Sequence, residues 1–192
     1  MSNPTNTSKN KVKFGLSNVH IFPIKNETST ATTYGEVIKI PGAVNLTLSA
    51  SGDDNTFYAD DIAYFKMWAN NGYEGDLEMA ILPEEFLITI LGQRKDSSGA
   101  VVESANDISK DFAMAFEFQG DVKRTRNILY KVTASRPDDE HATVTETKEP
   151  QTDSISIAAL PRMNDQLIKA RIEEGKTGYS TFYDKVYEPK FS

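Results

Sequence analysis

The chain has 192 residues, of which 39% are hydrophobic and 26% are charged, and its formal net charge is −7. The size and composition predict one domain with a single core. The acidic balance argues against a protein that grips nucleic acid, because such proteins need a basic face to displace counterions.

Cysteine is absent, which excludes disulfides, thiolate metal sites and thiol nucleophiles. No run of about 18 apolar residues predicts a transmembrane helix. The N-terminal stretch MSNPTNTSKNKVKF lacks the apolar core of a secretory signal. Synthesis in a cytoplasm is therefore expected.

Residues 1–11 are mainly Asn, Thr, Ser and Lys, which predicts a flexible N-terminal arm, and residues 12–192 are predicted to form the single domain. Beyond the arm, apolar and polar residues alternate with the period of two that is typical of half-buried strands. The predicted strands are residues 12–24, 36–40, 44–48, 57–69, 73–81, 112–118, 124–134, 155–159 and 167–172. Pro23 is expected to place the end of the first strand at a sheet edge or terminus. The last range also contains good helix formers, but its alternation favours a strand.

Two short helices are expected. Pro83 is compatible with the first turn of a helix, Glu84 and Glu85 suit the positive end of its dipole, and Gly92 is a natural stop. A second, C-terminal helix is predicted from apolar residues with helical spacing and ends at Pro189. Its apolar residues are Tyr179, Phe182, Tyr183, Val186 and Tyr187. The polar stretches 93–110 and 135–153 are predicted surface connections. Together these elements predict a mostly antiparallel β-sandwich or rolled barrel flanked by a helix.

Acidic residues are concentrated between residues 51 and 90, a stretch that contains nine acidic residues and one basic residue. The adjacent pairs Asp53–Asp54 and Asp60–Asp61 lack the alternate spacing of a calcium loop. The two histidines, His20 and His141, are not spaced as metal ligands. Motifs for a serine hydrolase, a phosphate-binding loop or a zinc protease are absent. The sequence therefore predicts no catalytic residue, no metal and no cofactor, and it favours a solvated acidic face. Two carboxylates that meet across a cleft as acid and base stay open as an alternative.

Trp68 and Tyr73 flank the turn signal Asn70-Asn71-Gly72. An exposed aromatic pair at this place would suit contact with a neighbouring subunit, because aromatic residues are enriched at interfaces. A place in the core at a strand end is an equally good interpretation. The sequence leaves both open.

Three segments, IPGAVNLTLS, FYADDIAYF and NNGYEGDLEMAILP, together resemble the major tail proteins of long, non-contractile-tailed bacteriophages of Gram-positive bacteria. The opening KVKFGLSNVHIFPI and the ending FYDKVYEP resemble the ends of that family, so the resemblance covers nearly the whole chain. The resemblance implies a virion structural protein that is made in the host cytoplasm, has no membrane partner and self-assembles. In that family six copies close into a ring, and stacked rings form a tail tube that conducts DNA from capsid to cell.

The resemblance also implies partners and contact residues. The partners are further copies of the chain, a tape-measure protein, the tail terminator and distal tail proteins, and passing DNA that is not bound in a sequence-specific way. Residues 50–73 match an extended loop that joins rings, and residues 1–11 match a terminal arm. The contact candidates are Asp53, Asp54, Asn55, Phe57, Tyr58, Trp68, Asn70, Asn71 and Tyr73. The candidates for acids that line the channel are Asp53, Asp54, Asp60, Asp61, Glu74, Asp76 and Glu78.

The charge distribution fits this hypothesis. Residues 1–40 carry five bases and two acids, whereas residues 135–160 carry two bases and six acids. Such asymmetry suits a heterologous contact between copies, although solubility alone would also explain it. An acidic lumen would repel DNA phosphates and keep the genome sliding. The alternatives are a tube subunit of a related injection system and a carbohydrate-binding or decoration β-sandwich module.

Overall fold

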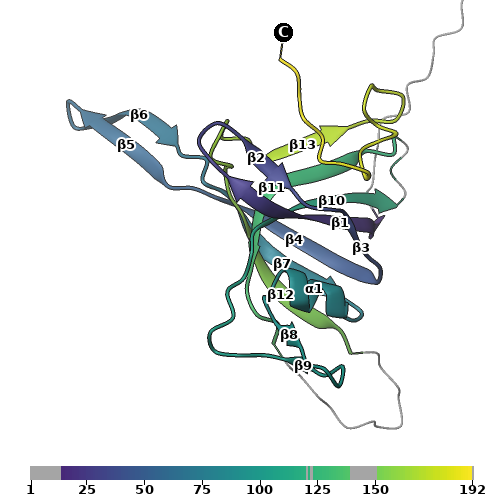
Figure 1. The fold of residues 1–192 in the computed structure, drawn as a ribbon. Coiled ribbons are helices and arrows are strands. Elements are labelled where there is room, and N and C mark those ends of the chain that lie inside the picture. Colours follow the sequence, from purple (N-terminus) through teal and green to yellow (C-terminus); the bar gives the residue numbers. More distant parts are fainter. Residues whose placement is uncertain (1–13, 120, 122, 139–150, 192) are drawn as a thin grey trace, which may run out of the picture.

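The computed structural model describes residues 14–119, 121, 123–138 and 151–191, and these form a mainly β fold with one short helix (Figure 1). The predicted arm, residues 1–11, and His141 lie outside the described residues. The elements are β1 (Phe14–Glu27), β2 (Thr32–Tyr34), β3 (Ile38–Ile40), β4 (Ala43–Ser51), β5 (Asp54–Ala59), β6 (Ile62–Trp68), β7 (Gly72–Met79), α1 (Glu84–Thr89), β8 (Arg94–Lys95), β9 (Val101–Val102), β10 (Phe112–Gln119), β11 (Arg126–Ala134), β12 (Asp153–Ala159) and β13 (Lys169–Ile172).

One curved antiparallel sheet organises the molecule. Its strands follow the order β2-β1-β10-β11-β12-β7-β4, while β3 pairs with β1 and β13 pairs with β11. The edge strands β2 and β4 do not pair with each other in the described residues, so the sheet curls without closing. The prediction of a mainly antiparallel β fold with a flanking helix is confirmed.

The main core lies on the concave side of this sheet, and α1 packs against it. Phe86 of α1 and the C-cap residue Ile90 are fully buried there, together with Leu77 of β7 and Phe112 of β10. The apolar spacing of this segment explains the packing. The helix ends at Thr89 with Ile90 as its C-cap, earlier than the stop predicted at Gly92, which follows with a φ of +79°. A helix of six residues cannot hold itself together in water, so burial of its apolar side stabilises it.

A second apolar cluster lies on the opposite face of β1, β10 and β11. Ala113 and Ala115 of β10 are fully buried in this cluster. The residues that cover them come from β13 and from the C-terminal segment. Both faces of β10 are therefore packed, and small alanine side chains leave room for the second layer.

The predicted C-terminal helix is wrong. Residues 173–185 form successive turns, with backbone bonds such as Phe182 N–H to the Tyr179 carbonyl and Asp184 N–H to the Thr181 carbonyl. The segment contains Gly178, Ser180 and Thr181, which are weaker helix formers than Ala or Leu. Phe182 and Val186 are nevertheless buried in the second cluster. The apolar spacing correctly indicated which residues are buried, but they lie in a series of turns and not in a helix.

Two strand boundaries also differ from expectation. β1 continues through Pro23 to Glu27, because the Pro23 carbonyl accepts a bond from Gly35 while the next amide, Ile24, bonds to Asp111. The predicted strand 57–69 is wrong as a single strand, since it divides at Asp60 and Asp61 into β5 and β6. The favoured strand at residues 167–172 is confirmed as β13, and residues 93–110 contain the short β8–β9 hairpin.

Candidate assembly surfaces

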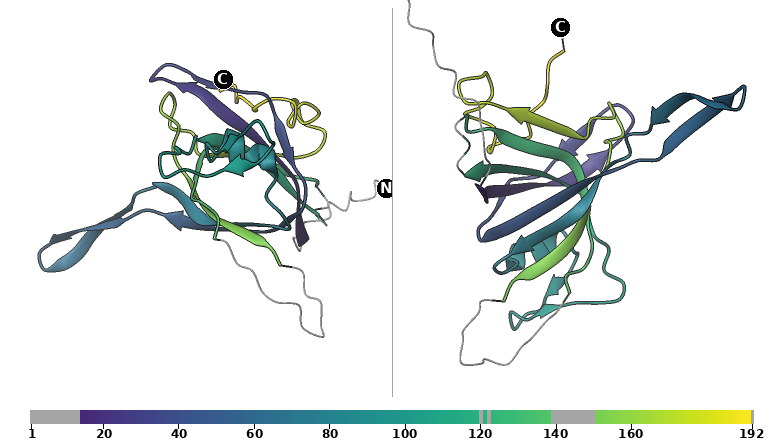
Figure 2. Two further views of the ribbon diagram at one scale, coloured as in Figure 1. Left: turned by 60° about the horizontal axis from the view of Figure 1, so that its bottom comes forward. Right: turned by 180° about the vertical axis from the view of Figure 1, so that it is seen from behind.

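The β5–β6 hairpin projects from the body of the molecule (Figures 1 and 2). β4 leads into β5 and β6 leads into β7, so the β4–β7 pair and the β5–β6 pair form one long two-stranded ribbon. The bonds from Ala69 N–H to the Asp53 carbonyl, 2.8 Å, and from Asn71 N–H to the Ser51 carbonyl, 2.9 Å, continue the ladder between the pairs. The sequence had assigned this region to an extended loop, and the structure gives it a regular backbone.

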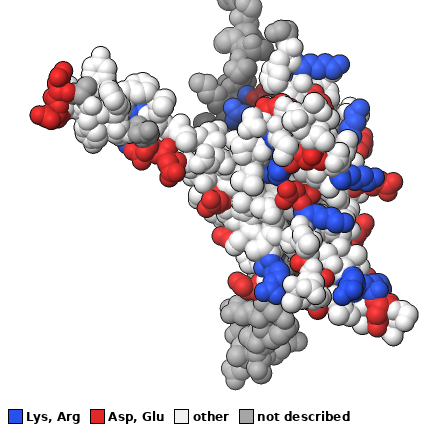
Figure 3. Space-filling model, turned by 60° about the vertical axis from the view of Figure 1, so that its left-hand side comes forward, with Lys and Arg blue, Asp and Glu red and all other residues white. Residues whose placement is uncertain are grey.

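The hairpin turns at Asp60 and Asp61, whose φ angles are 52° and 61°. Two consecutive left-handed residues are the requirement of the tight turn that matches strand twist, and aspartate is among the residues that tolerate this conformation. The two acids that the sequence analysis read only as charges therefore also shape the hairpin. They place two negative charges at its tip, which Figure 3 shows in red.

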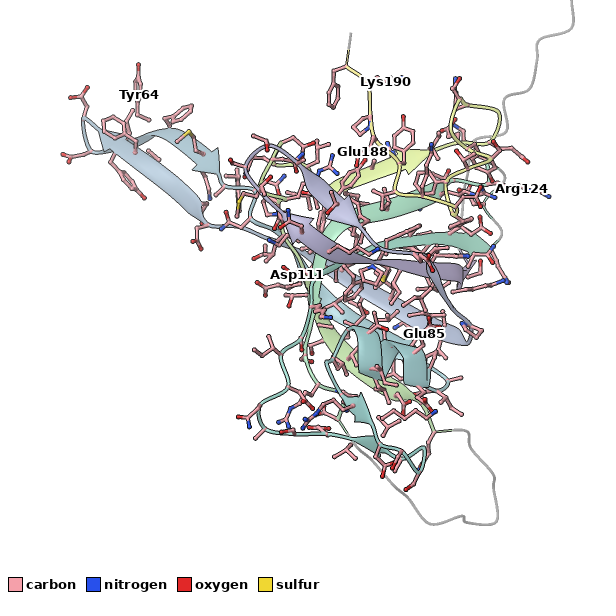
Figure 4. All side chains as sticks on the ribbon, viewed as in Figure 1. Tyr64, Glu85, Asp111, Arg124, Glu188 and Lys190 are labelled. Carbon is pink, nitrogen blue, oxygen red and sulfur yellow. The ribbon has the colours of Figure 1, made fainter. Side chains whose placement is uncertain are left out.

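Large apolar side chains of the hairpin are exposed to solvent. All seven residues of β6 are exposed, and none packs on the core. The exposed large residues are Phe57, Tyr58, Ile62, Tyr64, Phe65, Met67 and Trp68, with exposed fractions between 55% and 73%. Tyr64 stands off the hairpin near its tip (Figure 4). Large apolar side chains that gather on one exposed element are typical of interaction sites.

The register of β5 and β6 separates these side chains onto two faces. Phe57 pairs with Phe65 and Asn55 with Met67, so Phe57, Phe65 and Met67 share one face. After a bulge, Tyr58 pairs with Ala63, which places the neighbouring Ile62 on the Phe57 side. We call Phe57, Ile62, Phe65 and Met67 the apolar hairpin face.

The opposite face of the hairpin is more polar. Lys66 forms an ion pair of 2.7 Å with Asp54, and its ammonium lies 4.6 Å from the centre of the Trp68 ring. The hydrogen bond from Lys66 lowers the pKa of Asp54. Thr56 pairs with Lys66 on this same face. This face also carries the exposed rings of Tyr58 and Trp68, so it combines charged and aromatic side chains, whereas the apolar hairpin face has no charged residue.

The residues at the root of the hairpin have different environments. Trp68 is 71% exposed, whereas Tyr73 is half-buried against the main core. The interpretation as a core residue therefore holds for Tyr73, whereas Trp68 is exposed and its contact with a neighbouring subunit stays a prediction. Asn70 accepts a bond from the Gly72 N–H at 3.3 Å, and Gly72 has a φ of +108°. Asn71 belongs to the same connection, which returns the chain to the sheet.

Three further acidic candidates lie in a row on the solvent face of β7. Glu74, Asp76 and Glu78 alternate with residues that face the core. Each carboxylate accepts a hydrogen bond from a hydroxyl group: Ser51 to Glu74 at 3.0 Å, Ser156 to Asp76 at 2.8 Å and Thr152 to Glu78 at 2.6 Å. The structure therefore divides the seven acids into this row and a group on the hairpin. Asp53 and Asp54 lie at the hairpin root, and Asp60 and Asp61 lie at its tip.

The acidic row borders an open depression of about 540 Å³, which is lined by Asp76, Glu103, Ser135, Arg136, Pro137, Asp138, Ser154 and Ser156. Arg136 and Glu103 form an ion pair of 2.7 Å within it. Among the described residues no group of three or more His, Asp and Glu is placed to hold a metal ion. The depression is shallow and polar, and it offers no enclosed site for a small substrate. His20 lies elsewhere, stacked on Tyr183 at 4.4 Å, and burial lowers its pKa.

A buried ion-pair network was missed by the sequence analysis. The Arg162 side chain is 2% exposed, and it donates to both oxygens of Asp165 and both oxygens of Glu188 at 2.6–2.8 Å. It also donates to the Tyr34 hydroxyl at 3.3 Å and lies 4.4 Å from the Tyr130 ring centre. Glu188 belongs to the C-terminal segment (Figure 4), so this network fastens that segment to the sheet. Only the spacing of Arg162 and Asp165 gave a local signal.

Comparison with known proteins leaves the family open. Neither a protein-family model nor a curated protein matches the chain. Among solved structures, the chain is similar to one described as the baseplate of the anti-feeding prophage, determined by electron cryomicroscopy with six-fold symmetry. That match has a TM-score of 0.40 and 9% sequence identity, and it covers 90% of this chain and 97% of the other. A likeness at this level supports no statement about function. In the described ranges, no helix has the length and apolar character needed to cross a membrane.

Proposed function

We propose that this chain is a non-enzymatic virion structural protein, the repeating subunit of a phage tail tube. Six copies would close into a ring, and rings would stack around a tape-measure protein into a channel for DNA. The observation that carries the proposal is the β5–β6 hairpin, an ordered ribbon that holds exposed apolar side chains away from the body. A protein that acts as a monomer gains nothing from such a surface, whereas a subunit buries it on assembly.

The sequence resemblance supports the same proposal. The segments that resemble major tail proteins include β4, the hairpin and β7, which are the parts that build the projecting ribbon. The hairpin coincides with the stretch assigned to ring-to-ring contact, and it contains Phe57, Tyr58 and Trp68 among the contact candidates. In this proposal the finished subunit is part of the virion tail and is made in the cytoplasm of the host.

The acidic row on β7 is the best candidate for the channel wall. Glu74, Asp76 and Glu78 share one sheet face, and each accepts a hydrogen bond that fixes its carboxylate toward solvent. Negative charge on this face would repel DNA and prevent the counterion release that makes proteins hold DNA. A tube reconstruction that places all of these acids, and those of the hairpin, on the outer wall would overturn this assignment.

Electron microscopy of the purified protein tests the proposal. Negative-stain images and light scattering are recorded at low and high concentration, for the wild type and for a variant in which residues 54–68 are replaced by Asn-Gly. This dipeptide suits a two-residue turn between Asp53 and Ala69, which are already bonded. The wild type should form rings or hollow tubes, and the shortened variant should stay folded but fail to stack. A wild type that stays monomeric at high concentration and in the presence of a tape-measure protein would contradict the proposal.

A carbohydrate-binding module is the second candidate, because exposed aromatic side chains such as Trp68 can stack on sugars. Lys66 lies over the Trp68 ring, which leaves less of the ring free for such stacking. Titration with glycans should therefore give no binding that depends on Trp68. Saturable binding that is lost in Trp68→Ala would favour the module over the tube.

A further inference from the structure

We propose that Asn71 is a site of spontaneous deamidation, and that the fold protects it because the Asn70 side chain holds the backbone nitrogen that would react. Asn71-Gly72 is the one Asn-Gly step in the 192 residues. It lies in residues 69–72, which lead from β6 of the projecting hairpin into β7 and which we call the return connection (Figure 1). The inference concerns the single subunit and does not depend on the proposed function.

Deamidation joins two neighbouring groups of this step. The Gly72 backbone nitrogen attacks Cγ of the Asn71 side chain, a bond forms between them, and the bond from Cγ to Nδ2 breaks. The side-chain nitrogen leaves as ammonia, which takes up the proton lost by the backbone nitrogen, and a succinimide ring remains. Water then opens the ring at either carbonyl and gives aspartate or isoaspartate. Glycine favours the attack because it has no Cβ to hinder its nitrogen or to restrict its backbone.

The Asn70 side chain holds the nitrogen that would react. Its Oδ1 accepts a hydrogen bond from the Gly72 N–H at 3.3 Å, so the proton that must leave before the attack is already donated to a partner. Asn71 is exposed to solvent, whereas Gly72 is buried. Water can therefore reach the amide that would be lost, and the protection acts on the attacking nitrogen.

The backbone around this step is also fixed. The Asn71 N–H donates to the Ser51 carbonyl at 2.9 Å, and Gly72 pairs with Ser51 in the register of β4 and β7. Gly72 lies so close to β12 that an added Cβ would be 1.9 Å from the Ala159 carbonyl oxygen. Ring closure must turn the peptide between Asn71 and Gly72, and this requires these contacts to separate. The reaction therefore needs local opening of the return connection, and its rate reports that opening.

The product would alter the root of the hairpin. Isoaspartate carries the chain through its side-chain carbonyl, which adds a methylene group to the backbone between β6 and β7. The new carboxylate would also join Glu74 beside Ser51, whose hydroxyl donates to Glu74 at 3.0 Å. Both changes weaken the bonds between Ser51 and the return connection. The modified chain should therefore be cut sooner at Lys66 by trypsin under native conditions.

Peptide mapping by mass spectrometry tests the inference. The full chain is kept at mildly alkaline pH, either folded or unfolded in urea, and is then digested at mildly acidic pH. Trypsin releases residues 67–94, because the chain has no Lys or Arg between Lys66 and Arg94. Fragmentation of this peptide distinguishes Asn71 from Asn70 and isoaspartate from aspartate. Asn71 should be the fastest asparagine to deamidate in urea, and the folded chain should deamidate there at least about tenfold more slowly.

Substitution of Asn70 tests its role. Asn70→Ala should raise the rate in the folded chain roughly three- to tenfold, the factor expected for loss of one hydrogen bond, whereas Asn70→Asp keeps an acceptor oxygen and should stay within about twofold of the wild type. Val186→Ala is the control for overall stability. Val186 is buried in the second cluster, which contains no residue of the return connection. This variant should change the rate at Asn71 by less than about twofold, because the local hydrogen bond remains.

Three outcomes would overturn the inference. Equal rates in the folded and unfolded chains would show that the fold gives no protection. Equal rates in Asn70→Ala and Val186→Ala would show that overall stability, and not the Asn70 hydrogen bond, limits the reaction. Faster deamidation of another asparagine in urea would remove Asn71 as the reactive site. None of these results bears on the formation of rings or tubes, which microscopy tests separately.

Discussion

Removal of Arg162 should destabilise the fold by about 3 kcal/mol. Arg162→Ala deletes four charge-assisted hydrogen bonds to Asp165 and Glu188 and the packing of the guanidinium on the Tyr130 ring. Breaking a buried ion pair costs 3–5 kcal/mol when the remaining charge stays buried. The carboxylate side chains are 35% and 54% exposed and can regain water, which favours the lower end of that range. For a chain of this length, the loss lowers the melting temperature by roughly 6–12 °C.

Thermal and urea denaturation, followed by circular dichroism, measure this loss. Arg136→Ala is the matched control, because the Arg136 side chain is 75% exposed and its pair with Glu103 lies on the surface. An exposed pair contributes about 0–1 kcal/mol, so the control should melt within about 3 °C of the wild type. Limited proteolysis should also cut the C-terminal segment sooner in Arg162→Ala, since Glu188 loses its partner. Equal melting temperatures for the two variants would refute the buried network.

Three further predictions concern pH, backbone and charge. The hydrogen bond from Arg162 lowers the pKa of Asp165. The stability that this pair contributes is therefore present above the ordinary aspartate pKa of about 4 and is lost as the pH falls through the lowered pKa. Urea titrations should show a loss of unfolding free energy below about pH 4 and a smaller loss in Arg162→Ala. Gly72→Ala should lower the free energy of unfolding by at least about 3 kcal/mol, because the added Cβ would lie 1.9 Å from the Ala159 carbonyl oxygen. Gly175→Ala, with a similar positive φ but open space around it, should lower it by only about 1–2 kcal/mol. Similar losses in the two variants would show that β7 and β12 approach each other less closely than described. Lysine at positions 74, 76 and 78 should make assembled tubes retain DNA at low salt and release it as salt rises, while lysine at positions 84 and 85 should not; equal retention would remove the β7 row from the channel wall.

Local patterns predicted the elements whose period is undisturbed. The alternation in β7 and the helical spacing around Phe86 each reflect one buried face, so both were read correctly from neighbouring residues. The turn at Asp60–Asp61 was missed because aspartate is a weaker turn signal than glycine. The faces of the hairpin depend on a one-residue bulge between Phe57 and Tyr58, which no periodicity shows.

Long-range packing explains the remaining errors. The C-terminal apolar spacing predicted burial of Phe182 but not its backbone, because the second cluster accepts that ring from a turn as well as from a helix. The Arg162–Glu188 pair joins residues 26 positions apart, and nothing in the local sequence links them. The sequence could therefore predict the class of fold, but not the contacts between residues that lie far apart in the chain.

The hairpin sequence is better explained by assembly than by folding. No described side chain of β5 or β6 belongs to the main core, so the packing of that core does not require apolar side chains there. β4 and β7, on the same ribbon, alternate because one of their faces is buried, whereas β6 is exposed throughout and still carries Ile62, Phe65 and Met67. Exposed apolar strands promote unwanted association, which charged residues at their ends reduce. The acids at the tip and root of the hairpin fit that role, because they discourage indiscriminate contact and leave the apolar face available to a partner that fits it.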